Sequence, residues 1–124
     1  MQKQALKINA QVSWVYTHEL DSTAIFYADL LGLECCRDEG GARIFKTGDG
    51  AFIGLCQAFE DRVVEPAGGM ISLVTDDVDA CYQRLLENGL QIDSPPRRLD
   101  QFGIYSFFVR DPNGYVIEFQ SFER

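Results

Sequence analysis

Met70-Ile71-Ser72-Leu73-Val74-Thr75-Asp76-Asp77-Val78-Asp79 is the stretch from which the organisation of the whole chain can be worked out. Its apolar and β-branched first part predicts a strand over Met70–Thr75. Asp76-Asp77 can cap the helix that follows, and the apolar spacing extends this helix from Val78 to about Asn88. Gly89 then ends it. The stretch therefore predicts a strand and a helix in immediate succession.

The same order of elements occurs earlier in the chain. An extended, β-branched and aromatic segment predicts a strand over Lys7–Thr17, and Asp21-Ser22-Thr23 can cap a helix that runs to about Leu31. Gly32 ends this helix as Gly89 ends the other. Three strands are predicted after each helix: Leu33–Arg37, Ala42–Thr47 and Ala51–Gln57 in the first half, and Leu90–Ile92, Ile104–Val109 and Tyr115–Phe119 in the second.

This repeat predicts a single α+β domain over residues 1–124, built from two β-α-β-β-β modules. Module one covers about residues 8–57, a polar linker covers 58–69, and module two covers about 70–120. Neither module can easily bury both faces of its sheet alone. We therefore expect curved, mainly antiparallel mixed sheets around a cavity, with the helices outside.

Composition argues against two classes of partner. The chain has 11 Lys and Arg against 19 Asp and Glu, a net charge of −8, and its scattered basic residues make no patch for nucleic acid. No apolar run approaches the ~20 residues that span a bilayer, so no membrane is expected. The four cysteines show no CxxC spacing, which indicates reduced thiols in a cytoplasmic protein. The acidic balance favours a cationic ligand.

Three strings carry a resemblance to a known family, in order, over about Val12–Gln120. They are Leu20-Asp21-Ser22-Thr23-Ala24-Ile25-Phe26-Tyr27 with Leu30-Leu31-Gly32-Leu33, then Val74-Thr75-Asp76-Asp77-Val78-Asp79, then Phe108-Val109-Arg110-Asp111-Pro112-Asn113-Gly114-Tyr115-Val116-Ile117-Glu118-Phe119. On these residues the chain resembles the vicinal oxygen chelate superfamily, which includes glyoxalase I, extradiol dioxygenases, fosfomycin-resistance enzymes and bleomycin-resistance proteins.

The resemblance also implies where a metal would be held. Enzymes of this family use His, Gln or Glu on the first and last strands of each module, and these positions fall on Val12 or its neighbour Ser13, on Gly54, on Met70 and on Glu118. Only Glu118 binds metals well, and a catalytic metal needs about three protein ligands. We therefore expect no metal and no other cofactor, which favours a binding protein over an enzyme.

Seven residues are the candidate ligand contacts: Val12, Trp14, Tyr16, Met70, Ser72, Phe108 and Glu118. Trp14 and Tyr16 either fill a curved sheet or form a stacking wall for a planar ligand. Glu118 is either a carboxylate satisfied by internal hydrogen bonds or the recognition group for a cation or hydroxyl. His18, the only histidine, is expected near the rim, as a surface residue, as a contact of the bound molecule, or as a metal ligand or general base. Phe102 and Tyr105 are weaker candidates near the mouth of the cavity.

Three functions follow from these residues. The first is a metal-free protein, of the bleomycin-resistance type, that sequesters a small aromatic or cationic compound. The second is a metal-dependent lyase or dioxygenase of the same superfamily, and the third is a metal-free enzyme in which Glu118 is the general base. The resemblance further implies a homodimer, because most similar members build the cavity between modules of two chains.

Overall fold

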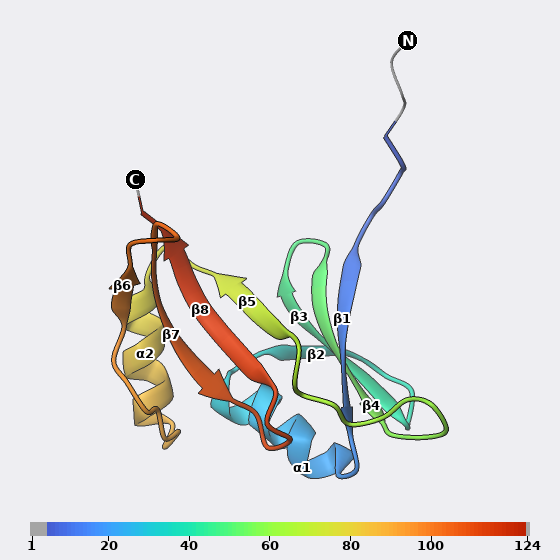
Figure 1. The fold of residues 1–124 in the computed structure, drawn as a ribbon. Helices are drawn as coiled ribbons and strands as arrows, with labels where there is room; N and C mark the ends of the chain where they lie inside the picture. Colours follow the sequence, from blue (N-terminus) through green and yellow to red (C-terminus); the bar gives the residue numbers. More distant parts are fainter. Residues whose placement is uncertain (1–4, 124) are drawn as a thin grey trace.

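The computed structural model describes residues 5–123 and shows the two modules in sequence (Figure 1). The first comprises β1 (Gln11–Thr17), α1 (Leu20–Ile25) with its π-helical continuation η1 (Phe26–Leu30), β2 (Glu34–Asp38), β3 (Ala42–Gly48) and β4 (Ala51–Gln57). The second comprises β5 (Met70–Val74), α2 (Val78–Glu87), β6 (Arg97–Leu99), β7 (Ile104–Arg110) and β8 (Val116–Phe122). The predicted α+β fold of two β-α-β-β-β modules is confirmed.

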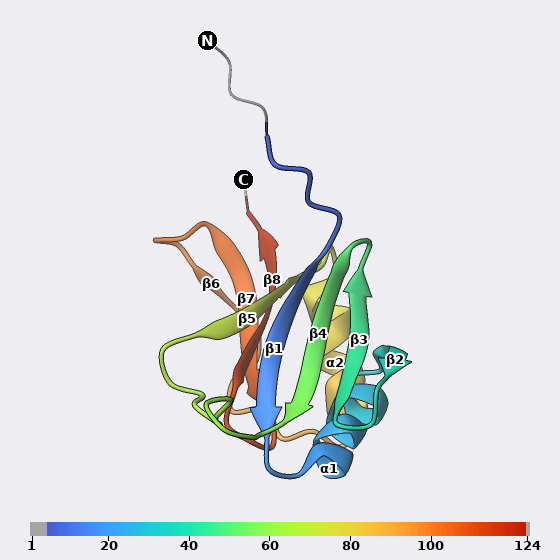
Figure 2. The ribbon, with the colours of Figure 1, turned by 90° about the vertical axis from the view of Figure 1, so that its right-hand side faces the viewer.

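Each module forms one four-stranded mixed sheet. Sheet one has the order β1-β4-β3-β2, seen across its strands in Figure 2, and sheet two has the order β5-β8-β7-β6. The first strand of each module pairs parallel with the last, and the other pairs are antiparallel. The two sheets therefore have the same topology, as the repeat in the sequence predicts.

Each helix packs on one face of its own sheet. Tyr27 of η1 lies 6.1 Å from Phe45 of β3, and Tyr82 of α2 lies 5.3 Å from Phe107 of β7, between ring centroids. The buried apolar residues of both modules form one continuous core. We call the opposite face of each sheet, which neither α1 nor α2 covers, its open face.

Both helices end on a glycine, as predicted. Gly32 and Gly89 have φ of 72° and 91°, in the left-handed region that favours glycine. The residue after each glycine then donates its N–H back to a carbonyl of the helix end: Leu33 to Tyr27 and Leu90 to Leu85, both at 3.0 Å. The two helix ends are thus closed by the same local geometry.

One predicted strand limit and one predicted strand are wrong. Residues 7–10 do not join β1 and instead extend away from both sheets, because β4 begins at Ala51 opposite Gln11 and leaves them no partner (Figure 1). The strand predicted at Leu90–Ile92 is absent, and β6 pairs with β7 only from Arg97 onward. Leu90 and Ile92 pack against the core instead, and Pro95-Pro96, which lack N–H groups, precede the pairing.

The predicted cap of the first helix is also wrong. The helix begins at Leu20, and Glu19 precedes it without a side-chain capping bond. Thr17 Oγ1 accepts the N–H of Glu19 at 3.0 Å, so the hydroxyl at the end of β1 holds this corner. Asp77 does cap α2, by accepting the N–H of Ala80 at 3.0 Å.

The turn between β7 and β8 joins the two modules. Asp111, at its start, is 4% exposed and accepts the Tyr27 hydroxyl at 2.8 Å and the N–H groups of Asn113 and Tyr115 at 2.8 and 3.0 Å. Burial, followed by the nearby Asp111 carboxylate, raises the pKa of Tyr27 far above its ordinary value. A carboxylate of module two is thereby bound to the helical segment of module one.

Asn113 of the same turn bonds to module one a second time. Its Oδ1 accepts the hydroxyl of Thr17 at 2.9 Å, and its Nδ2 donates to the hydroxyl of Thr23 at 3.2 Å. Thr17 and Thr23 also bond to each other at 2.9 Å, and both are fully buried. Every polar side chain at this junction therefore has a partner.

Within residues 5–123, none of the helices has the length and apolar character needed to cross a membrane.

We expect Tyr27→Phe to lower the free energy of unfolding by about 1.5–3 kcal/mol, the value of a hydrogen bond to a charged group. Above pH 10 the folded state keeps the Tyr27 proton, because the pKa is raised, whereas an unfolded tyrosine loses it. The free energy of unfolding of the wild type should therefore fall, through this group, by up to about 1.4 kcal/mol per pH unit above pH 10. Urea titrations at pH 8 and at pH 10.5–11 measure both effects. A variant as stable as the wild type, or one with the same alkaline slope, would contradict the assignment.

Candidate functional site

Val12, Trp14 and Tyr16 lie on the open face of sheet one. They alternate along β1 with Val15 and Thr17, which are 0% exposed on the side of α1. Trp14 is 42% exposed, and its ring covers Gly54, its register partner on β4. A Cβ at position 54 would lie 2.6 Å from ring atoms of Trp14. The glycine therefore gives the indole a place to lie flat against the sheet.

Tyr16 is bound to the linker between the modules. Arg62 donates from Nη1 to the Tyr16 hydroxyl at 3.0 Å, and this bond raises the pKa of the Arg62 guanidinium. Phe59 and Arg62 exchange backbone hydrogen bonds, so the linker makes a tight turn there. Tyr16 thus meets a cation from the same chain, and its hydroxyl already accepts one hydrogen bond.

Glu118 lies on the open face of sheet two and is 2% exposed. Its Oε1 accepts the hydroxyl of Ser72, the register partner on β5, at 2.6 Å, and Nε2 of Gln120 at 3.3 Å. Ile117 and Phe119 alternate with it and are buried on the side of α2. The strand therefore holds a carboxylate in the sheet with hydrogen bonds on one of its two oxygens.

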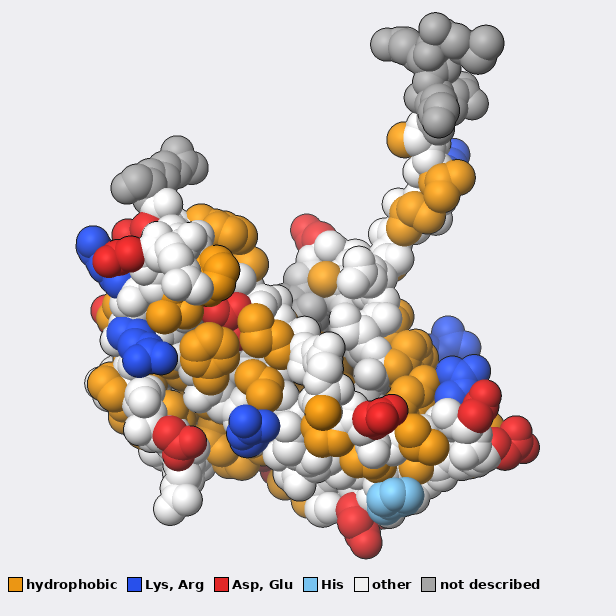
Figure 3. All heavy atoms as spheres, viewed as in Figure 1, with side chains coloured by type: hydrophobic (Ala, Val, Ile, Leu, Met, Phe, Trp, Pro, Cys, Tyr) orange, Lys and Arg blue, Asp and Glu red, His pale blue; other side chains and the backbone are white. Residues whose placement is uncertain are grey.

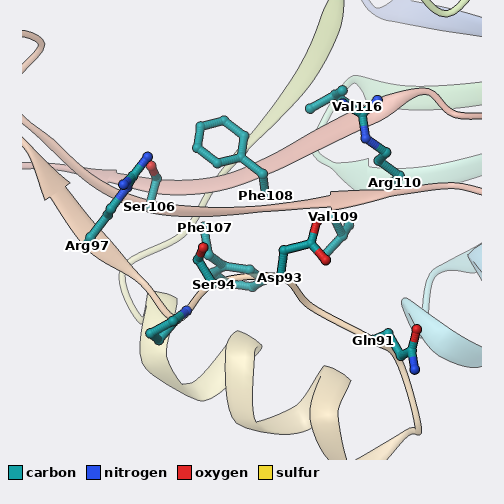
Figure 4. A pocket seen from close by; sticks show the side chains of 11 residues that line it. Gln91, Asp93, Ser94, Arg97, Ser106, Phe107, Phe108, Val109, Arg110 and Val116 are labelled. Carbon is teal, nitrogen blue, oxygen red and sulfur yellow. The ribbon is translucent and has the colours of Figure 1, made fainter.

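Met70 and Phe108 line two separate grooves. Trp14 and Met70 share a groove of about 350 Å³ between β1 and β5, bordered by the linker residues 65–69. Phe108 lines a groove of about 420 Å³ along β7, together with Arg97, Ser106 and Arg110 (Figure 4). Val116, at the beginning of β8, lines both grooves. The remaining predicted contacts, Val12, Tyr16, Ser72 and Glu118, line neither.

The weaker candidates lie apart from these residues. The hydroxyl of Tyr105 donates to Asp79 of α2 at 2.6 Å, which raises the pKa of Tyr105 and places it on the helix side of sheet two. Its expected place at the mouth of a cavity is therefore wrong. Phe102 is 65% exposed in the turn before β7. His18 is exposed just after β1, and its carbonyl accepts Nε2 of Gln57.

Two contacts of this region were not predicted from sequence. Gln120 follows Glu118 by two residues on the same strand face, so strand alternation alone could have identified it. Arg62 gives no such signal, because its position depends on the path of the linker. Both residues bond directly to predicted site residues, Gln120 to Glu118 and Arg62 to Tyr16.

The donor set at the four family metal positions does not fit a metal. Val12, Gly54 and Met70 supply no oxygen or nitrogen ligand, and the ring of Trp14 occupies the space that a side chain at position 54 would need. Among residues 5–123, no group of three or more His, Cys, Asp or Glu side chains lies close enough to hold a metal ion.

A family model described as Glyoxalase/Bleomycin resistance protein/Dioxygenase superfamily matches residues 8–119. Among solved structures, a glyoxalase/bleomycin resistance protein/dioxygenase from Nocardioides has a TM-score of 0.78 at 20% identity, covering 99% of this chain and 87% of that one. An integron cassette protein from V. cholerae has a TM-score of 0.73 at 23% identity, covering 99% of each chain. Lactoylglutathione lyase from Agrobacterium tumefaciens has a TM-score of 0.70 at 25% identity, covering 89% of this chain and 90% of that one. No curated protein matches.

We expect Gly54→Ala to displace the indole of Trp14, because the new methyl group would overlap its ring. Tryptophan emission should shift to longer wavelength, and stability should fall by about 1 kcal/mol, the low end for overpacking, since the exposed ring can swing outward. Gly48→Ala on β3 is the matched control, because nothing lies within 4 Å of its added Cβ. Unchanged emission in Gly54→Ala would contradict the stacking of Trp14 on Gly54.

Proposed function

The chain belongs to the glyoxalase/bleomycin resistance protein/dioxygenase superfamily, and we propose that within it this protein binds a small aromatic or cationic molecule without a metal. The observation that carries the proposal is the donor set. Three of the four family metal positions hold Val12, Gly54 and Met70, and a catalytic metal needs about three protein ligands. Glu118 alone falls well short of that number.

Two residues at or beside these positions, Met70 and Trp14, support ligand binding in place of metal chemistry. Trp14 is half-exposed and lies flat on its sheet, which leaves one ring face free for a planar group. Met70 is 56% exposed in the same groove and can adapt to a ligand of irregular shape. A groove with apolar walls and a few fixed polar groups is the usual composition of a small-molecule site.

Charge supports a cationic group on the ligand. The net charge of −8 attracts cations over distance, and Glu118 is a fixed carboxylate whose side-chain hydrogen bonds within residues 5–123 all reach Oε1. Arg62 lies at Tyr16, so the positive end of a ligand is better placed at sheet two than at sheet one. We therefore propose that an aromatic cation binds with its ring toward Trp14 and its charge toward Glu118.

We also propose that two chains form a homodimer through the open faces. Large apolar side chains remain exposed on these faces in the single chain, among them Trp14, Met70 and Val74 at 42%, 56% and 62%. Apolar residues gather on the face of sheet two in Figure 3. Exposed patches of this kind mark interaction sites, and pairing modules of two chains would bring stacking and acidic residues to one cavity.

A metal-dependent lyase is the alternative suggested by the likeness to the Agrobacterium lactoylglutathione lyase. Elemental analysis of the purified protein should detect no stoichiometric transition metal, because the positions offer one carboxylate. Glu118→Gln should leave the metal content unchanged, at background. About one zinc, nickel, iron or manganese per chain, lost in Glu118→Gln, would establish the alternative and overturn the metal-free proposal.

Benzamidine, a planar cation, should quench the fluorescence of the single tryptophan, and its neutral analogue benzamide should bind more weakly. By calorimetry, Trp14→Ala should weaken benzamidine binding about 30-fold, since stacking and cation–π contacts contribute ~1 kcal/mol each and about 1.4 kcal/mol corresponds to a tenfold change in affinity. Glu118→Gln should weaken benzamidine by ~10–100-fold and benzamide little, because only the cation loses a charge-assisted bond.

The control for these variants is Trp14→Phe, which keeps an aromatic face and should retain most of the affinity. Equal affinities of wild-type protein for benzamidine and benzamide would remove Glu118 from recognition. Absence of binding by either compound and by a wider panel of aromatic cations would refute the proposed ligand class.

A further inference from the structure

Two polar atoms in the interior of sheet two have no hydrogen-bond partner among the described residues. They are Oγ of Ser106 and Oε1 of Gln120, on side chains that are 1% and 9% exposed. Leaving such an atom unpaired costs free energy, so each unpaired group in a folded protein needs an explanation. Neither atom takes part in the contacts that hold the fold together.

Both atoms belong to one row across the open face. Arg97 of β6 is the register partner of Ser106 of β7, which in turn is the partner of Gln120 of β8. Adjacent strands are about 4.8 Å apart, so the row from Arg97 to Gln120 is roughly 10 Å long between Cα atoms. Phe107 and Phe119, the neighbours in sequence, stack on the helix side at 5.0 Å, which places the row on the opposite, open face.

The orientation of the Gln120 amide is fixed by its neighbour. Nε2 donates to the carboxylate of Glu118 at 3.3 Å, and the reversed amide would direct its oxygen at that carboxylate. Oε1 must therefore point away from Glu118 as an acceptor without a donor. Ser106 and Gln120 are register partners and still do not bond to each other.

The two ends of the row differ in chemistry. At one end, the unused hydroxyl of Ser106 lies in the same groove as Arg97, whose side chain runs toward it in Figure 4 and makes no ion pair within residues 5–123. At the other end, Gln120, whose Oε1 is unused, is hydrogen-bonded through Nε2 to Glu118. One end therefore offers hydrogen-bond donors and a positive charge, and the other offers acceptors and a negative charge.

Apolar side chains surround this polar row. Val74, the register partner of Gln120 on β5, is 62% exposed, and Phe122 at the end of β8 is 67% exposed. Phe108 borders the row on the same face and lines the groove that contains Arg97 and Ser106. Hydrophobic side chains over β5 and β8 dominate this face in Figure 3. A polar floor with an apolar margin suits a ligand that has both a charged head and an apolar body.

We propose that this row binds the zwitterionic head of an aromatic amino acid or a similar molecule, with its carboxylate on Arg97 and Ser106 and its ammonium on Gln120 and Glu118. The inference rests on the proposed binding function and specifies its ligand class. An isolated cation would leave the Arg97 guanidinium unpaired, and an isolated anion would leave Gln120 Oε1 without a donor and the Glu118 charge unpaired. A head with both charges pairs the two orphaned atoms and at the same time uses the charges of both Arg97 and Glu118.

The test compares three compounds with the same ring: L-phenylalanine, phenethylamine, which has only the ammonium, and 3-phenylpropionate, which has only the carboxylate. Quenching of Trp14 and calorimetry on the wild-type protein measure the three dissociation constants. L-Phenylalanine should bind at least about tenfold more tightly than either analogue, the factor that one lost hydrogen-bonded pair produces. This comparison needs no variant.

Two variants then separate the ends of the row. Ser106→Ala should weaken L-phenylalanine and 3-phenylpropionate and leave phenethylamine unchanged, whereas Gln120→Leu should weaken L-phenylalanine and phenethylamine and leave 3-phenylpropionate unchanged. Ser22→Ala, exposed on α1, and Gln83→Leu, exposed on α2, are the matched controls, since both lie away from the groove. A merely structural role would affect the three compounds equally.

The outcomes separate this inference from the proposed function. If phenethylamine binds as tightly as L-phenylalanine and Glu118→Gln weakens both, the cation-binding proposal stands and the zwitterion is wrong. If both variants weaken all compounds by one factor or by none, a buried water satisfies the two atoms and the inference is overturned. If neither these compounds nor benzamidine binds, both proposals fail.

Discussion

The arrangement of the two modules depends on the hydrogen bond between the buried carboxylate of Asp111 and the hydroxyl of Tyr27. The carboxylate accepts hydrogen bonds from this tyrosine of module one and from two N–H groups of its own turn, and so it carries a charge in the interior with three donors around it. Asn113, two residues later, continues the contact into the paired hydroxyls of Thr17 and Thr23. The helices and the helix-covered faces of both sheets pack into one apolar core on this junction. The open faces are left for other contacts.

On those open faces, the residues present decide the chemistry more than the fold does. The fold is shared with a lactoylglutathione lyase and with proteins described only by family, and a shared fold does not transfer a function. In this chain a tryptophan ring lies where a ligating side chain on β4 would stand, and Glu118 is hydrogen-bonded to Ser72. Both observations favour recognition of an organic ligand over metal chemistry, which is the basis of the proposed function.

The strand and helix order was predictable from local patterns, because alternation, Asp caps and terminal glycines act within a few residues. Those patterns identified β4 to the residue and ended both helices correctly at Gly32 and Gly89. Local patterns failed where strand formation depends on a partner distant in sequence. Residues 7–10 have the alternation of a strand but no strand to pair with, and β6 begins only at Arg97, where pairing with β7 begins. Alternation also placed Trp14 and Glu118 on the open faces. It did not foresee the bond from Arg62 to Tyr16 or the burial of Asp111, which depend on contacts 46 and 84 residues apart in the chain.

The most direct test of ligand recognition on the open faces is a titration of ¹⁵N-labelled protein with benzamidine, followed by NMR. The indole N–H of Trp14 reports on sheet one and the side-chain amide of Gln120 on sheet two, beside Glu118. We predict that both signals shift together and saturate with one dissociation constant, with the remaining surface amides unaffected. Shifts confined to exposed residues away from the two open faces would contradict this prediction. A shift of only one of the two signals, with no change in the other at saturation, would contradict it as well.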